Sequence, residues 1–131
     1  MLDEEDILAG AFVFERESGI EIGSDNERVI TNSLFSNSEP DQVECQLKAC
    51  IEECMEINTK LVGTSIWALG KRPKAFDVNY FKNLLSLLIE SDMEAAFQAL
   101  IVLSTHGDLH LPSADIFEKE KNYEIAKAYL S

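Results

Sequence analysis

The hydrophobic pattern of this chain is helical over most of its length and is clearest in residues 77–105. Apolar residues recur there at three- and four-residue spacing in two segments joined by a two-residue turn. Asp77 and Asp92 are placed to cap the segments, because an aspartate side chain accepts the unpaired N–H groups at a helix start. Each segment is apolar over most of its circumference, which predicts burial. We therefore expect a helical hairpin at the centre of the fold, with Leu85 and Leu100 fully buried.

A second long helical pattern begins near Pro40. Ser38 and Asp41 are spaced like a capping box, and Pro40 lies in the first turn of the helix, where proline is tolerated. Gly63 breaks or merely weakens this helix, because the apolar stripe continues at the right spacing as far as Gly70, which is a candidate C-cap. The stripe predicts the following core positions: Val43, Leu47, Cys50, Ile51, Cys54, Ile57 and Leu61.

Residues 4–22 are open to two interpretations. Asp3 can cap a helix whose first turn is acidic, as the helix dipole favours. The alternation of Ile20 and Ile22 with polar residues also fits a small β-hairpin, but an isolated two-stranded hairpin is marginal, so we favour the helix. A short helix capped by Ser24 or Asp25 follows, and a thin apolar stripe predicts a final covering helix over 114–130, capped by Ser113.

These elements predict a mainly α-helical protein with one domain over residues 1–131, arranged as an antiparallel helical bundle or a short α-solenoid-like stack. A hydrophobic content of 46% is too high for a disordered chain. The apolar runs are far shorter than a membrane span requires, and the acidic N-terminus lacks the basic region of a signal peptide. Three cysteines, an odd number, do not indicate a disulfide framework. We expect a cytoplasmic protein with Cys50 and Cys54 in the core and Cys45 outside it.

Residues 106–110 read His-Gly-Asp-Leu-His, which resembles the catalytic loop of aminoglycoside phosphotransferases and related kinases. That resemblance implies an aspartate that orients the attacking hydroxyl, but the pattern then requires asparagine where this chain has Ser113. A phosphate-covering glycine-rich loop and a strand lysine are also missing. His106, Asp108 and His110 could alternatively hold a metal, although such ligand types often adjoin by chance in loops. We expect no cofactor, no metal and no catalytic residues here, and an ordinary loop after a helix.

Trp67 has two interpretations. A single tryptophan on an apolar stripe is typical of partial burial in a core. Tryptophan is also enriched at the centres of protein interfaces, so a role as an interface anchor stays open.

Charge is the feature with the most direct bearing on function. The net charge is −13, and residues 1–58 carry 15 acids and 3 bases whereas residues 59–131 carry 9 acids and 8 bases. Phosphates repel such a surface, so nucleic acid is not an expected partner. Self-repulsion at this density destabilises a fold unless something offsets it, so we expect a strongly basic protein partner. The acidic residues expected to bind that partner are Glu15, Glu17, Glu21, Asp25, Glu27, Glu52, Glu53 and Glu56.

In its small size, helical pattern and acidity, the whole chain resembles the immunity proteins of bacterial toxin systems, of the contact-dependent growth inhibition and nuclease-bacteriocin types. The resemblance implies a cytoplasmic binding protein, not an enzyme, that neutralises a cognate basic toxin domain of the nuclease class by covering its active site. The alternatives are a helical adaptor for another basic protein and, less favoured, a small metal-dependent or kinase-like enzyme that uses the His106–His110 loop.

Overall fold

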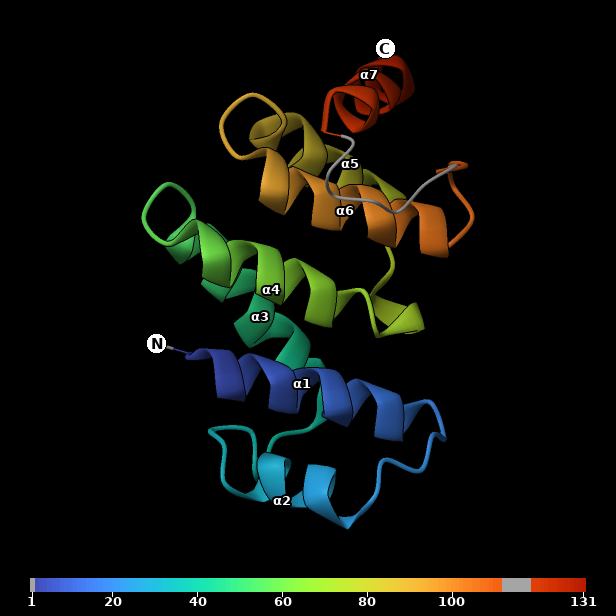
Figure 1. Cartoon of the computed structure of the whole chain (residues 1–131). Coiled ribbons are helices and arrows are strands. Elements are labelled where there is room, and N and C mark those ends of the chain that lie inside the picture. The colour runs from blue at the N-terminus through green and yellow to red at the C-terminus, as the bar shows by residue number, and fades with distance from the viewer. Residues whose placement is uncertain (1, 112–118) are drawn as a thin grey trace. The chain divides into compact units, whose positions relative to one another are not determined.

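The computed structural model describes residues 2–111 and 119–131, and every regular element in these ranges is helical. Seven α-helices and one short 3₁₀ helix occur in the described part of the chain (Figure 1). The mainly α fold class is therefore confirmed. The chain divides into two compact units, Met1–Ala75 and Phe76–Ser131, each described by itself below. The expectation of a single domain stays a prediction.

The first unit contains four α-helices and the 3₁₀ helix. They are α1 (Glu4–Glu17), α2 (Ser24–Thr31), α3 (Pro40–Cys54), α4 (Thr59–Leu69) and η1 (Pro73–Ala75). Helix α1 contacts α2, α3 and α4, and α3 packs along α4 (Figure 1). Gly10 permits the close approach of α1 to α3, because a Cβ atom there would lie only 3.1 Å from Val43 Cγ1. Fully buried side chains from the four α-helices form the core, including Ile7, Phe14, Ile30, Leu47, Ile51, Ile66 and Leu69.

Helix α1 confirms the helical interpretation of the N-terminal segment. Asp3 accepts the Asp6 N–H at 2.8 Å, and the Asp6 carboxylate accepts the Asp3 N–H at 3.1 Å, which makes a reciprocal capping box. Asp6 also accepts the Leu34 N–H at 3.0 Å and so fixes the start of α1 against the segment after α2. Gly19 ends the helix with a φ of 88°, a conformation in which a side chain would be strained. The stretch that we considered as a hairpin is therefore one helix and its C-terminal turn.

Two predicted helix starts in this unit differ from the structure by one residue. Gly23 is the N-cap of α2 and makes no side-chain capping bond, whereas Ser24 or Asp25 was expected. At α3 the capping box joins Glu39 to Gln42 rather than Ser38 to Asp41. The three-residue spacing of a capping box occurs both between Ser38 and Asp41 and between Glu39 and Gln42. The structure uses the second pair, which leaves the Asp41 side chain available for another contact.

The predicted long helix is wrong beyond Cys54. Helix α3 ends there, and α4 begins at Thr59 with Asn58 as its N-cap, whose side chain accepts the Leu61 N–H at 3.3 Å. Gly63 is a buried interior residue of α4 and not the break point. Ile57, expected in the core, is 83% exposed. The apolar spacing continues across the break because α3 and α4 each bury one face, and the asparagine cap supplies the competing helix start.

The second unit contains α5 (Val78–Leu88), α6 (Met93–Thr105) and α7 (Lys119–Leu130). The predicted hairpin is confirmed: Asp77 accepts the Asn79 N–H at 3.0 Å, and Asp92 accepts the Ala95 N–H at 3.2 Å. Leu85 and Leu100 are fully buried. Leu87 is 63% exposed, so the buried stripe covers less of the circumference of α5 than its apolar residues predict. The hairpin is the core of this unit, and the first unit has buried core residues of its own.

Polar contacts and one buried alanine attach helix α7 to the hairpin. Glu90 accepts hydrogen bonds from the Tyr123 hydroxyl at 2.8 Å and from Lys127 at 2.7 Å, and both contacts lower the pKa of Glu90. Ala126 is fully buried. The predicted Ser113 cap and the first residues of the predicted helix lie outside the described residues. None of the described helices is long and apolar enough to cross a membrane.

Candidate functional site

The two structural units differ less in net charge than residues 1–58 and residues 59–131 do. The first unit carries 15 acidic and 7 basic residues, a net charge of −8, and the second carries 9 acidic and 4 basic residues, a net charge of −5. The difference arises because Lys60, Lys71, Arg72 and Lys74 belong to the same unit as the acidic residues that precede them. The acidic residues must therefore be considered together with the basic residues beside them.

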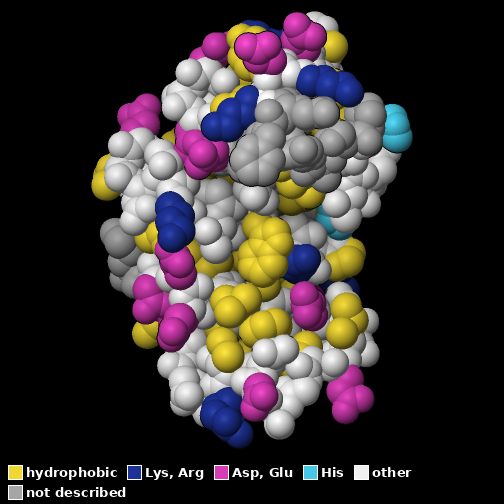
Figure 2. Space-filling model, in the orientation of Figure 1, with side chains coloured by type: hydrophobic (Ala, Val, Ile, Leu, Met, Phe, Trp, Pro, Cys, Tyr) yellow, Lys and Arg dark blue, Asp and Glu magenta, His cyan; other side chains and the backbone are white. Residues whose placement is uncertain are grey.

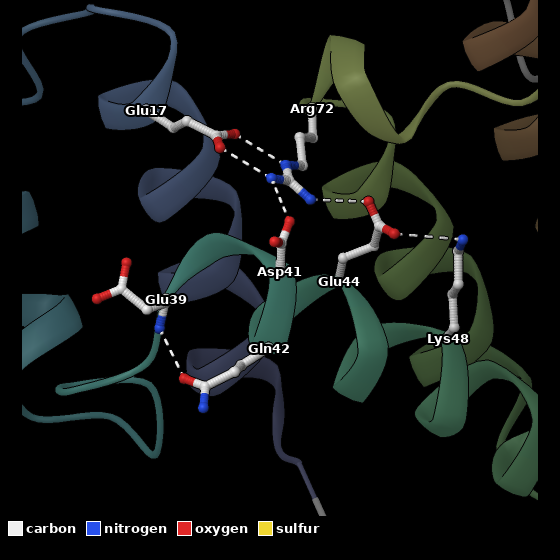
Figure 3. A network of polar contacts seen from close by, with 7 residues as sticks. All are labelled: Glu17, Glu39, Asp41, Gln42, Glu44, Lys48 and Arg72. Carbon is white, nitrogen blue, oxygen red and sulfur yellow. Dashed lines mark hydrogen bonds and ion pairs between the residues drawn. The ribbon is translucent and has the colours of Figure 1, made fainter.

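Arg72 lies at the centre of a cluster that uses several of these acids. Its guanidinium contacts three carboxylates: Glu17 from the end of α1 in a bidentate pair at 2.8 Å for each bond, Asp41 at 2.8 Å and Glu44 at 2.9 Å, both from the start of α3 (Figure 3). The Arg72 side chain is only 6% exposed. We call these four residues the Arg72 cluster.

The Arg72 cluster is an internal ion-pair network. Hydrogen bonding to Glu17 raises the pKa of Arg72 above its usual value, so the guanidinium stays charged despite its burial. In turn the hydrogen bond from Arg72 lowers the pKa of Glu17. Lys48 adds a second cation at 3.5 Å from Glu44. Part of the acidity that we expected a partner to offset is therefore offset within the protein.

Other predicted binding residues near the α1–α2 connection also contact basic side chains. Arg16 binds Glu27 at 2.6 Å, and Arg28 lies 3.8 Å from Asp25. Glu15 is half-buried, and Glu21 is exposed. With Glu17 in the Arg72 cluster, three of the five residues predicted in this region are engaged in ion pairs with the protein's own arginines.

The remaining three predicted residues differ from the paired acids and resemble Glu21, which is exposed and has no ion pair among the described residues. Glu52 and Glu53 lie in the last turn of α3, and Glu56 lies in the turn before α4; all three are exposed. In the part of the chain that the structure describes, no ion pair involves any of them. We call Glu52, Glu53, Glu56 and Ile57 the acidic turn. Its carboxylates are available to a partner.

The acidic turn has a regular backbone conformation. Met55 has φ −59° and ψ 128°, Glu56 has φ 71°, and the Cys54 carbonyl accepts the Ile57 N–H at 3.0 Å. This is a type II turn, in which the third residue requires positive φ and is usually glycine. The Asn58 N–H also bonds to the Cys54 carbonyl, at 2.8 Å, and leads directly into α4. The turn therefore holds Glu56 and Ile57 outward in a fixed conformation.

The eight predicted residues do not form one patch. In Figure 1 the turn between α3 and α4 lies at the same end of the first unit as the start of α1, and the α1–α2 connection lies at the opposite end. An ion pair of 2.9 Å between Lys60 and Glu4 ties α4 to α1 at the end that carries the acidic turn. Sequence analysis placed all eight in one surface because it could not separate these ends.

Trp67 is half-buried on α4, and the Lys71 ammonium lies 5.0 Å from the centre of its ring. Figure 2 shows hydrophobic side chains gathered over α1 and α4 on the face that it draws, with acidic and basic side chains mixed around them. Partial burial agrees with the interpretation of Trp67 as a core residue, and a role at an interface stays a prediction.

The cysteine positions are as the helical pattern predicted. Cys50 and Cys54 are buried with their Sγ atoms 3.9 Å apart, and Cys45 is exposed. The Ser65 hydroxyl lies 3.5 Å from Cys50 Sγ. Burial raises the pKa of Cys54, so its thiol stays protonated and unreactive near neutral pH.

The histidine loop has structural contacts. The His106 ring stacks on Phe76 with ring centres 4.3 Å apart, and Asp108 accepts a hydrogen bond from the Tyr129 hydroxyl. Burial and this bond raise the pKa of Tyr129. Among the described residues no group of three or more histidine, cysteine or acidic side chains is placed to hold a metal ion. Ser113, at the position where the kinase pattern requires asparagine, lies outside the described residues.

Comparison with protein-family models, curated proteins and solved structures gives no match to this chain.

Proposed function

We propose that this chain is an immunity-type binding protein that neutralises a cognate basic toxin domain, of the nuclease class, by covering its active site with the acidic turn of the first unit. The observation that supports the proposal is the environment of Glu52, Glu53 and Glu56. Five of the seven basic residues of the first unit pair with carboxylates in the described structure, and none of these carboxylates belongs to the acidic turn.

Electrostatics supply the inhibitory mechanism. The active site of a nuclease is basic because it receives phosphates, and carboxylates can occupy the positions that phosphates would take. The helical bulk behind the turn would then exclude the nucleic acid. Because the charges act before contact, we expect steered association, with rates on the order of 10⁸ M⁻¹s⁻¹ at low salt that fall as salt screens the field.

The test is to measure association of the protein with a panel of basic nuclease toxin domains, including any encoded beside its own gene, and to assay nuclease activity in the complex. Reversing two charges, Glu52→Lys with Glu53→Lys, should slow association roughly tenfold or more at low salt and weaken inhibition. The matched control is Glu120→Lys with Glu124→Lys on α7, which changes the net charge equally at exposed positions of the other unit.

Two results would contradict the proposal. An association rate that is indifferent to salt between roughly 0.05 and 0.5 M, and to reversal of the two glutamates, would remove the acidic turn from the mechanism. A basic domain that is bound tightly but keeps full activity would indicate the adaptor function instead.

A further inference from the structure

Ile57 occupies an unusual place for a large aliphatic side chain. It is 83% exposed, the highest value among the exposed large hydrophobic residues of the described structure. Its neighbour Glu56 is the one non-glycine residue with positive φ in the described ranges. That conformation is strained for any residue with a Cβ, and glycine is the usual choice at this position of a type II turn. Glu56 and Ile57 therefore each depart from a local preference: a residue other than glycine has positive φ, and a large aliphatic side chain is exposed to solvent.

The last turn of α3 departs from a third preference, which is for basic rather than acidic residues at the C-terminal end of a helix. Glu52 and Glu53 lie in the last turn, where the helix dipole places partial negative charge, and that turn contains no basic residue. Acidic side chains are unfavourable at this end of a helix. Neither burial nor an ion pair in the described residues compensates for them. Local choices that oppose folding and have no compensation within the fold are typical of residues kept for binding.

We propose that Ile57 is the apolar anchor of the docking surface, which enters an apolar depression on a basic protein partner while Glu52, Glu53 and Glu56 pair with lysine and arginine side chains around it. This inference rests on the proposed function and names the element that makes the contact. An apolar centre with a polar rim is the usual organisation of a protein interface.

Charge complementarity determines the class of occupant. Between Ala49 and Thr59 the sequence contains three glutamates, the exposed Ile57 and no basic residue, and the flanking Lys48 and Lys60 are paired with Glu44 and Glu4. An anionic surface, such as a phosphate backbone or an acidic lipid headgroup, would be repelled at this turn. A second copy of this chain would bring its own acidic turn or another acidic surface, since both units carry net negative charge. A basic protein can supply cations to the carboxylates and an apolar depression to the isoleucine.

The two kinds of side chain should affect different kinetic steps. Rim charges act mainly on the association rate, because they steer the encounter. An apolar anchor acts mainly on the dissociation rate, because its contacts form only in the docked complex. Ile57→Ala should therefore speed dissociation roughly tenfold while leaving the salt dependence of association unchanged.

The experiment measures association and dissociation with a basic toxin domain that the wild-type protein inhibits. The matched control is Leu34→Ala, which truncates another exposed aliphatic side chain of the same unit, 62% exposed. The expected result is faster dissociation for Ile57→Ala and unchanged kinetics for Leu34→Ala. Unchanged dissociation of Ile57→Ala from a partner that the wild type inhibits would overturn the anchor and leave the proposed function standing. Failure of the wild type to bind any basic domain would overturn both.

Thermal stability provides an independent test of the docking role of Ile57. The Ile57 side chain contributes little to the fold if its role is docking, so Ile57→Ala should melt at the wild-type temperature. A marked fall in its melting temperature would assign Ile57 to the folded structure of the first unit and overturn the anchor, whatever the binding result.

Discussion

The two ends of the first unit use the same residue type in opposite ways. In the Arg72 cluster, glutamates and an aspartate from α1 and α3 converge on a buried guanidinium and stabilise the contact between helices (Figure 3). In the acidic turn, Glu52 and Glu53 at the end of α3 and Glu56 in the turn that follows are exposed and have no ion-pair partner in the described part of the chain. The buried Arg72 guanidinium requires compensating carboxylates, whereas an exposed carboxylate is solvated without a cation.

This contrast shows that net charge alone does not locate a binding surface. The protein's own arginines engage several of the acidic residues that sequence analysis assigned to a partner, including Glu17 and Glu27. For the proposed basic partner, the candidate contacts are the acids for which the described structure supplies neither burial nor a cation. The predictions below test whether the two ends differ in this way.

The largest effect is expected at Arg72. Arg72→Met should lower the free energy of unfolding by about 3 kcal/mol, because it leaves Glu17 and Glu44 clustered without their cation. The estimate lies at the low end for a broken buried ion pair because Asp41 is 90% exposed and remains solvated. Urea denaturation measures the change. Lys74→Met, which removes the same charge from an exposed side chain, is the control, and an equal effect of the two substitutions would contradict the cluster's role.

A smaller effect is expected from pH acting on Glu17. Its pKa is lowered in the folded protein from the ordinary value of 4.5, so its ion pair stabilises the fold above that pH and the contribution is lost as the pH falls through the lowered value. The stability difference between the wild type and Glu17→Gln should therefore be constant from pH 7 to 5.5 and shrink below pH 4.5. Urea melts at several pH values measure it.

The same substitution in an Arg72→Met background controls for other acidic groups. There the contribution that depends on pairing should be absent, because the largest cause of the lowered pKa is the hydrogen bond from Arg72. A pH dependence that survives unchanged in that background would assign it to residues outside the Arg72 cluster.

The smallest effect is expected at the acidic turn and has the opposite sign. Glu56→Gly should raise the free energy of unfolding by about 1 kcal/mol, because glycine adopts the positive φ of this position without strain. Glu53→Gly, the same chemical change inside α3, should lower it by roughly 0.5–1 kcal/mol through the cost of glycine in a helix. Chemical denaturation of both variants tests the pair. Destabilisation by both would mean that the Glu56 side chain supports the fold.

Much of the fold could be predicted because its signals are local. The capping aspartates Asp3, Asp77 and Asp92 act within three residues of their own position, and the buried faces of α5 and α6 repeat within four. Leu85 and Leu100 were therefore identified correctly. Cys50 and Cys54 were placed in the core for the same reason, since they lie one helical turn apart on the buried face of α3.

The errors occurred where two local signals competed. The apolar spacing from Val43 to Leu61 is continuous, and only the asparagine cap at Asn58 indicates a new helix start. The periodicity alone predicts a buried Ile57, whereas the structure exposes it. Asn58, followed three positions later by the apolar Leu61, was the signal in the sequence that could have placed a helix start here and Ile57 outside the core.

The sequence by itself determined the helical class, the N-caps of α1, α5 and α6, the central hairpin of the second unit and the overall acidity, because each depends on residues within about one turn of one another or on composition alone. The tertiary structure decided which acids are free. Arg72 meets Glu17 across 55 residues, Asp41 across 31 and Glu44 across 28. Which carboxylate finds a cation therefore depends on how α1, α3 and the segment after α4 pack. Because local propensities do not determine that packing, the sequence could not distinguish the carboxylates of the Arg72 cluster from those of the acidic turn.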